Sequence, residues 1–246
     1  MKNKNLIIIP ARSGSTRVKD KNIKKVGGKP LIYYIIKACV LSKSARVIVS
    51  TNSNRIAKLA IKFGADVPFL RPKIISNSKS STISCLIHAL KWFKNNEKWE
   101  PDNVAICPPT NPFIKKDTVK KMFDLFIKNK KSNSIVTIYK PIDHPFSLIK
   151  KKNKFLKFGT CKINNYNWFD FERTQEWPNA YSYSPAVRIT RVKYFKKFYN
   201  NNLIKIYNKA FDTRKCMGFF VSQTEAFDIN ENLDFEIANN LIKNLK

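Results

Sequence analysis

The chain has 246 residues, 43% of them hydrophobic and 13% aromatic, which is enough to bury one large core. The apolar residues never form the run of roughly 18 that spans a bilayer, and Arg12 interrupts the first apolar segment before it reaches the length of a signal peptide. The net charge of +30 comes from lysines spread from end to end, without the motifs of a nucleic-acid-binding domain, and predicts a solvated basic surface. We therefore expect a cytoplasmic protein with no membrane partner and no specific nucleic-acid partner.

Short apolar runs alternate with amphipathic stretches from the N-terminus to about residue 139. The apolar, β-branched runs predict strands at Leu6–Ile9, 45–51, 103–107 and 134–139. Between them, helical periodicity and cap residues predict a helix beginning at Pro30 and helices over 54–64, 81–94 and 117–127. This alternation is typical of an α/β fold with a mostly parallel, doubly wound sheet.

The pattern loosens between about residues 144 and 180, where lysine-rich and aromatic stretches suit an inserted β-hairpin or flap. A strand at 186–190, a short helix near Tyr194 and a strand at 217–222 then resume the main pattern. A final helix is expected in which Leu233, Ile237, Leu241 and Leu245 recur every fourth residue. The whole chain, 1–246, is therefore expected to form a single domain with one insertion.

A polar loop follows the first predicted strand. It holds the small residues Ser13, Gly14, Ser15 and Thr16 and the cations Arg12, Arg17, Lys19, Lys21, Lys24 and Lys25. Small residues and cations just before a helix suit an anionic ligand. The loop lacks both G-x-x-x-x-G-K-[ST] and G-x-G-x-x-G, so neither a Walker site nor a dinucleotide fingerprint is indicated.

The stretch IIIPARSGSTRVKDKNIKKVGGKPLI contains the order P-A-R-x-G-S-x-R, then K-N, then G-K-P-L. This order resembles the N-terminal signature of the cytidylyltransferases that activate sialic acids and related nine-carbon sugar acids. The resemblance continues through VIVSTNSNRIAKLAIKFGADVPFLRP, SSTISCLIHAL, CPPTNPF and FDINENLDFEIA. It covers most of positions 6–140 and about the last 25 residues.

The resemblance implies a Rossmann-like nucleotidyltransferase, commonly dimeric, that uses CTP and Mg²⁺ to make a CMP-sugar acid and release pyrophosphate. Arg12 and Lys21 match the loop cations expected to stabilise the leaving pyrophosphate. The positions that match the family's nucleotide-binding residues are Ala11, Arg12, Ser13, Gly14, Ser15, Lys21, Asn22, Arg71, Ser81 and Thr82. For Arg17, Lys19, Lys24 and Lys25, a solvated loop charge is the alternative interpretation.

The metal motif is altered, because the family's D-x-D reads DIN here. The resemblance places Mg²⁺ on Asp228 and Asn230, and a cap for the final helix is the alternative role for Asp228.

The sugar side departs further from the family pattern. Asn52 replaces an aspartate, Pro108 replaces a polar residue, and SPAVRIT lacks the arginine of the family's R-P-N-G-A-I-Y. Thr110 and Arg188 are the predicted acceptor-binding residues, with Arg191 as the alternative cation. A solvent-facing position on the strand is the alternative for both arginines. The insertion at 144–180 is expected to serve dimerisation or the sugar side.

Three functions remain in competition at this level. The first is a cytidylyltransferase for a nonulosonic acid, with CTP and a small acidic sugar as ligands. The second is a catalytically degenerate member that binds nucleotide or sugar, and the third is an enzyme that activates the eight-carbon acid of lipopolysaccharide. His88 lies among apolar residues of a predicted helix and is interpreted as a packed side chain.

Overall fold

The computed structural model describes residues 4–15, 17–199 and 211–244, so Thr16 and Leu245, named above, lie outside the described residues. The strands are β1 Asn5–Pro10, β2 Lys25–Val26, β3 Lys29–Pro30, β4 Arg46–Ser50, β5 Asn103–Ile106, β6 Ser134–Tyr139, β7 Lys150–Lys152, β8 Phe155–Lys157, β9 Ser182–Arg191 and β10 Cys216–Phe220. The α-helices are α1 Leu31–Leu41, α2 Asn54–Lys62, α3 Thr82–Asn96, α4 Lys116–Lys128, α5 Val192–Tyr199, α6 Gln223–Ala226 and α7 Asn232–Asn244. The short 3-10 helices are Lys21–Ile23, Lys73–Ile75, Pro145–Ser147, Trp168–Asp170 and Thr174–Glu176.

The main sheet has six strands in the order β10-β6-β9-β5-β1-β4. β1 pairs in parallel with both β4 and β5, and β10 pairs in parallel with β6. β9 runs antiparallel to both of its neighbours, β5 and β6. The mostly parallel α/β sheet is confirmed, and the reversed strand, which local sequence pattern does not reveal, divides it into two halves.

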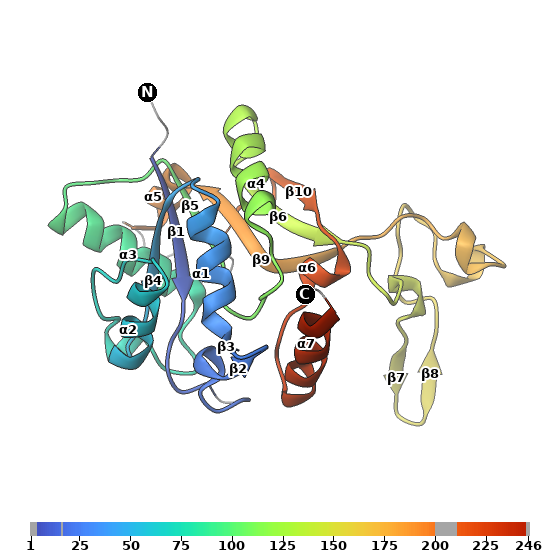
Figure 1. The fold of residues 1–246 in the computed structure, drawn as a ribbon. Coiled ribbons are helices and arrows are strands. Elements are labelled where there is room, and N and C mark those ends of the chain that lie inside the picture. The colour runs from blue at the N-terminus through green and yellow to red at the C-terminus, as the bar shows by residue number, and fades with distance from the viewer. Residues whose placement is uncertain (1–3, 16, 200–210, 245–246) are drawn as a thin grey trace.

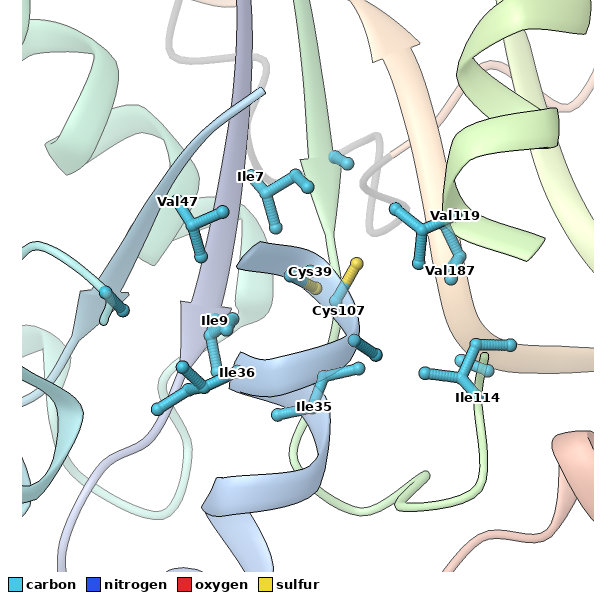
Figure 2. Close-up of a cluster of buried hydrophobic side chains, with 14 of the residues drawn as sticks. Ile7, Ile9, Ile35, Ile36, Cys39, Val47, Cys107, Ile114, Val119 and Val187 are labelled. Carbon is cyan, nitrogen blue, oxygen red and sulfur yellow. The ribbon is translucent and has the colours of Figure 1, made fainter. Parts of the chain in front are cut away.

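Helices cover both faces of this sheet (Figure 1). Ile7 and Ile9 of β1 belong to the larger core, which also contains side chains of α1 and α4. Figure 2 shows part of that core, with Ile9 directed toward Ile36 of α1. Leu6 and Ile8 of the same strand pack with α3 and α5 on the other face. The continuous apolar run of the first strand is therefore explained, since β1 is buried on both sides.

The last helix, α7, packs beside the small β2–β3 ribbon (Figure 1). Phe235, Ala238 and Ile242 are its buried residues, whereas Leu233 is 63% and Ile237 is 38% exposed. The predicted helix is confirmed, but the repeat at every fourth residue does not mark the buried face. Four residues of an α-helix turn by about 400°, which is about 40° more than a full turn, so residues spaced by four move gradually around the helix. Residues spaced alternately by three and four stay on one face.

The insertion carries the expected β-hairpin, formed by β7 and β8, which projects from the body of the molecule (Figure 1). Its exposed apolar side chains include Phe155 at 78% and Phe169 at 73%. Among the described helices, none has both the length and the apolar character needed to cross a membrane.

Candidate functional site

The carboxyl ends of three parallel strands, β1, β4 and β5, lie side by side at one edge of the sheet. The segments that follow them begin at Ala11, Thr51 and Cys107. The Ala11 amide donates to the Ser50 carbonyl at 3.0 Å, which joins the first two segments. Crevices at this edge of an α/β sheet are where such folds bind ligands.

The loop after β1 is held in an open, curved shape by its own side chains. Gly14 has a φ of +74°, and a Cβ there would meet nothing within 4 Å, so the backbone faces open space. Arg12 Nη1 donates to the Gly14 carbonyl at 2.9 Å, and Asn22 Nδ2 donates to the Arg12 carbonyl at 2.9 Å. The Ser13 amide donates to Asn52 Oδ1 at 2.8 Å. Asn52 therefore keeps an acceptor role that an aspartate would also fill.

Lys21 begins the short 3-10 helix that follows this loop, and it is only 8% exposed. Its Nζ donates to the Ile229 carbonyl at 2.6 Å, so the loop is fastened to the segment before α7. Burial lowers the pKa of Lys21, while the nearby Asp228 carboxylate opposes that shift. The predicted loop cation and the predicted metal residue therefore lie within electrostatic range of each other.

The segment before α7 presents Asp228 and Asn230 to the loop. Asp228 Oδ1 is buried without a hydrogen-bond partner among the described residues, and its Oδ2 accepts from Asn230 Nδ2 at 3.0 Å. Asn230 Oδ1 accepts from Arg17 Nη1 at 3.0 Å. Asp234 accepts from the amides of Asn230 and Glu231 at 2.7 and 2.8 Å. The helix-capping role thus belongs to Asp234, and Asp228 keeps an oxygen available.

Two residues after β5 hold this segment in place. The Thr110 carbonyl accepts from the Ile229 amide at 2.8 Å. Asn111 is fully buried, and its Nδ2 donates to the carbonyls of Ala226 and Phe227 at 3.2 and 3.0 Å. Thr110 is therefore placed at the site, where its backbone positions the segment that carries Asp228.

Arg71 is buried at the end of β4, with 6% of its surface exposed. Its Nε donates to Ser50 Oγ at 3.0 Å and its Nη2 to the Ser50 carbonyl at 2.5 Å. Burial lowers the pKa of Arg71, and the nearby Arg12 guanidinium acts in the same direction. The two arginines therefore gather at the end of β4 although they lie far apart in the sequence.

The N-terminus of α3 lies next in the chain after Arg71. Ser81 is the cap of this helix, and its Oγ accepts from the Ser84 amide at 3.2 Å, while Thr82 is its first residue. His88, further along α3, makes an edge-on contact with Phe69 at 4.6 Å between ring centroids. Burial lowers the pKa of His88, and Arg71 adds to the shift.

The two candidate arginines of β9 differ in what holds them. Arg191 donates to the carbonyls of Ser132, Phe126 and Asn129, so its guanidinium closes the end of α4. Arg188 Nε is buried without a hydrogen-bond partner among the described residues. Of the two, Arg188 is the one whose guanidinium has an N–H donor without a partner among the described residues.

Sequence reasoning missed several residues that shape this site. Arg17, for which a solvated loop charge is the alternative interpretation, is exposed and also donates to Asn230. Ser50 and Asn111 orient other groups through hydrogen bonds that connect distant segments. Ser50 lies in the motif VIVSTNSNRIAKLAIKFGADVPFLRP and Asn111 lies in CPPTNPF, but only the fold brings these positions to their hydrogen-bond partners.

A family model described as Cytidylyltransferase matches residues 6–238. An N-acylneuraminate cytidylyltransferase of Escherichia coli is 27% identical over 97% of this chain and 52% of its own length. A CMP-N,N'-diacetyllegionaminic acid synthase of Campylobacter jejuni is 29% identical over 98% of this chain and 96% of its own length. The chain spans about half the length of the first curated relatives it matches, between 52% and 54% of each.

Among solved structures, a CMP:2-keto-3-deoxy-manno-octonic acid synthetase complexed with CTP superimposes with a TM-score of 0.70. It shares 15% sequence identity and the match covers 99% of this chain and all of that one, which shows a common fold. The family match over nearly the whole chain and the ordered motifs around one sheet edge agree. The chain belongs to the cytidylyltransferase family.

Proposed function

We propose that the protein transfers CMP from CTP to a nonulosonic, sialic-acid-like sugar acid and releases pyrophosphate. The observation that carries the proposal is the convergence of Arg12, Lys21, Arg71 and Asp228 on one sheet edge, around a loop with open space at Gly14. The names of the relatives, which include an N-acylneuraminate cytidylyltransferase and a diacetyllegionaminic acid synthase, support this acceptor class.

In this proposal the loop and its cations bind the triphosphate. An acceptor hydroxyl attacks the α-phosphorus and loses its proton to water as the new phosphodiester bond forms. The bond between the α-phosphorus and the oxygen that bridges to the β-phosphorus breaks, and pyrophosphate leaves with that oxygen. Negative charge then builds on pyrophosphate, where Arg12 and Lys21 stabilise it. A fixed cation in a partly buried site acts more strongly than one in water because solvent screens it less.

Ala11, Ser13, Ser15 and Asn22 would shape the phosphate side of the pocket. Arg71, Ser81 and Thr82 would hold the nucleoside side, where Ser50 fixes the direction of the Arg71 guanidinium.

We propose Mg²⁺ as the cofactor. Asp228 Oδ1 is a buried, unpartnered carboxylate oxygen, which is the kind of ligand that Mg²⁺ prefers. No group of three or more His, Cys, Asp or Glu side chains gathers as a complete metal site in the described part of the chain, and Mg²⁺ usually completes its shell with phosphates and water. Bound there, the ion would neutralise phosphate charge. Asn230 would assist only after turning its carbonyl from Arg17 toward the ion.

We also propose that the enzyme is a cytoplasmic homodimer, with the 144–180 insertion in the interface. The exposed apolar side chains of Phe155 and Phe169 support this arrangement, because large apolar patches commonly mark interaction surfaces. Sedimentation of the purified chain at micromolar concentration tests it, and a monomer at every concentration would remove the dimer from the proposal.

Pyrophosphate release tests the activity. The protein is incubated with CTP, Mg²⁺ and, in turn, N-acetylneuraminic, N,N'-diacetyllegionaminic, pseudaminic and 3-deoxy-manno-octulosonic acids. Release with a nine-carbon acid is expected. Release with the eight-carbon acid alone would show that the protein activates the eight-carbon acid of lipopolysaccharide. No release despite CTP binding would show that it is a catalytically degenerate member of the family.

A further inference from the structure

Arg188 lies where β5 ends, one strand away from β1 and the phosphate loop. On β9 it is paired with Ile106, the last residue of β5, and with Val136 of β6. β5 separates β9 from β1 in the sheet. A cation at this place is therefore set off from the loop cations, toward the half of the sheet that contains β6 and β10.

The guanidinium of Arg188 has unused hydrogen-bonding capacity. Its Nε is buried and has no hydrogen-bond partner among the described residues. None of the ion pairs found in the described part of the chain includes Arg188. A buried donor on a charged group is costly to leave unpaired, so a ligand that accepts from it would recover that cost.

Tyr183 of the same strand lies close to Arg188, whose positive charge opposes the rise of the Tyr183 pKa. The Tyr183 ring also stacks on Phe211, with centroids 5.6 Å apart. Partial burial raises the pKa of Tyr183, and Asp228 is close enough to add to that rise. Tyr183, beside Arg188, is therefore within electrostatic range of the proposed metal residue Asp228.

The chemistry of this pair suits a carboxylate. A guanidinium presents parallel N–H donors that match the two oxygens of a carboxylate, and a phenol adds a third donor. Phosphate could also bind a guanidinium, but the loop cations that suit a triphosphate lie beyond β5. Arg191, the other candidate, is already engaged with three backbone carbonyls.

We propose that Arg188, oriented by Tyr183, binds the carboxylate of the acceptor sugar acid. The assignment rests on the proposed function and adds to it the residue that selects an acid over a neutral sugar. Arg188 contacts the substrate in this proposal, and Tyr183 is a positioning residue.

The variants Arg188→Met and Arg188→Lys are compared with wild type, with exposed Lys193→Met as the matched control. Arg188→Met should raise KM for the best acceptor of the panel by on the order of 10- to 100-fold, while KM for CTP stays within about twofold. The acceptor KM of Arg188→Lys should lie between those of wild type and Arg188→Met, because lysine keeps the positive charge but lacks the parallel N–H donors of the guanidinium. Tyr183→Phe should raise the same KM less than Arg188→Met does. An unchanged acceptor KM in Arg188→Met would overturn the proposal.

The methyl ester of the same acid separates a carboxylate contact from a general disturbance. Wild type should prefer the acid over the ester by about the factor that Arg188→Met loses, and the variant should treat the two nearly alike. Equal discrimination by wild type and variant would contradict the proposal. A CTP-dependent rise in melting temperature, kept in both variants, shows that each is folded.

Calorimetric binding of N-acetylneuraminic, N,N'-diacetyllegionaminic and pseudaminic acids in the presence of CTP needs no turnover. If wild type releases no pyrophosphate but binds an acid that Arg188→Met does not bind, the proposed activity fails and the carboxylate site stands. Binding by both proteins with equal affinity, or by neither, would overturn the Arg188 assignment.

Discussion

At the scale of single residues, Lys21 fastens the loop to the Ile229 carbonyl, and in the proposed function the same ammonium group stabilises the leaving pyrophosphate. Lys21→Met keeps the apolar stem and removes the charge, so folding should be disturbed less than catalysis. We expect turnover to fall about 100- to 1000-fold, as when a preorganised donor to developing charge is removed. Steady-state pyrophosphate release measures this, with exposed Lys19→Met as the control. Near-normal turnover in Lys21→Met would show that Lys21 has a structural role and does not contribute to catalysis.

Asp228 and Asn230 predict how activity depends on Mg²⁺. Asp228→Asn keeps the shape and removes the charge, so it should abolish turnover while α7 stays formed, since Asp234 provides the capping contacts. Asn230→Asp adds a carboxylate beside Asp228 and should lower the Mg²⁺ concentration needed for half-maximal rate. Mg²⁺ titrations of the three proteins decide the question. Wild-type activity in Asp228→Asn would show that this segment does not bind the metal.

His88 predicts an acid-sensitive contribution to stability. Its pKa is lowered from 6.5 in the folded chain by burial and by Arg71, so the unfolded chain takes up the proton first as the pH falls. The free energy of unfolding should therefore drop below about pH 6.5. His88→Leu should flatten that part of the profile. Urea unfolding at about pH 7.5 and pH 5.5 measures the difference, and equal pH dependence in both proteins would show that His88 does not contribute.

The residues of the candidate site could be predicted to different degrees from the sequence. Motif positions such as Arg12, Lys21, Arg71 and Asp228 were identified because their order along the chain resembles a known family. Asn111 was not, because its contacts run to Ala226 and Phe227, more than a hundred residues away. Local patterns carry no information about such hydrogen bonds, which depend on the packing of distant segments.

At the scale of elements, α7 closes the site by packing on the segment from Val18 to Leu31. Gly27 lies at this contact with a φ of +55°, and a Cβ there would approach Ile242 Cγ2 at 2.5 Å. Neighbouring Gly28 has a φ of +83° but open space around its missing side chain. Substitutions at Gly27 and Gly28 therefore distinguish the cost of a steric contact with α7 from the cost of backbone strain alone.

Gly27→Ala should destabilise the protein by about 2–4 kcal/mol, because backbone strain and overpacking against α7 add. Gly28→Ala should cost about 1–2 kcal/mol from the strain alone. Denaturant unfolding of both variants measures the two costs. An equal loss in the free energy of unfolding for both variants would mean that α7 shifts away from the new Cβ at no cost.

Element types followed closely from periodicity, while the orientation of β9 did not. The strand at 186–190 was expected from its apolar residues, and β9 extends from Ser182 to Arg191. Its antiparallel direction depends on the path of the chain through the 144–180 insertion, which composition describes only as irregular. The buried face of α7 follows Phe235, Ala238 and Ile242, at steps of three and four residues, and not the residues that recur every fourth position.

At the scale of the whole molecule, the proposed activity requires that both halves of the sheet serve one reaction. The half containing β1, β4 and β5 carries the phosphate loop and Arg71, and β9 brings Arg188 to the end of β5. The net charge of +30 favours association with anionic ligands in general. Selectivity must therefore come from the placed groups rather than from overall charge.

Nucleotide selectivity at equilibrium is the measurement that tests the cytidylyltransferase account most directly. The melting temperature is recorded with CTP, UTP, ATP and GTP at equal concentration, with Mg²⁺ and at physiological salt, so that the general attraction of a basic surface for triphosphates is common to all four. We predict a clearly larger rise with CTP, and that Arg71→Met reduces this difference. Equal rises with all four nucleotides would contradict the account.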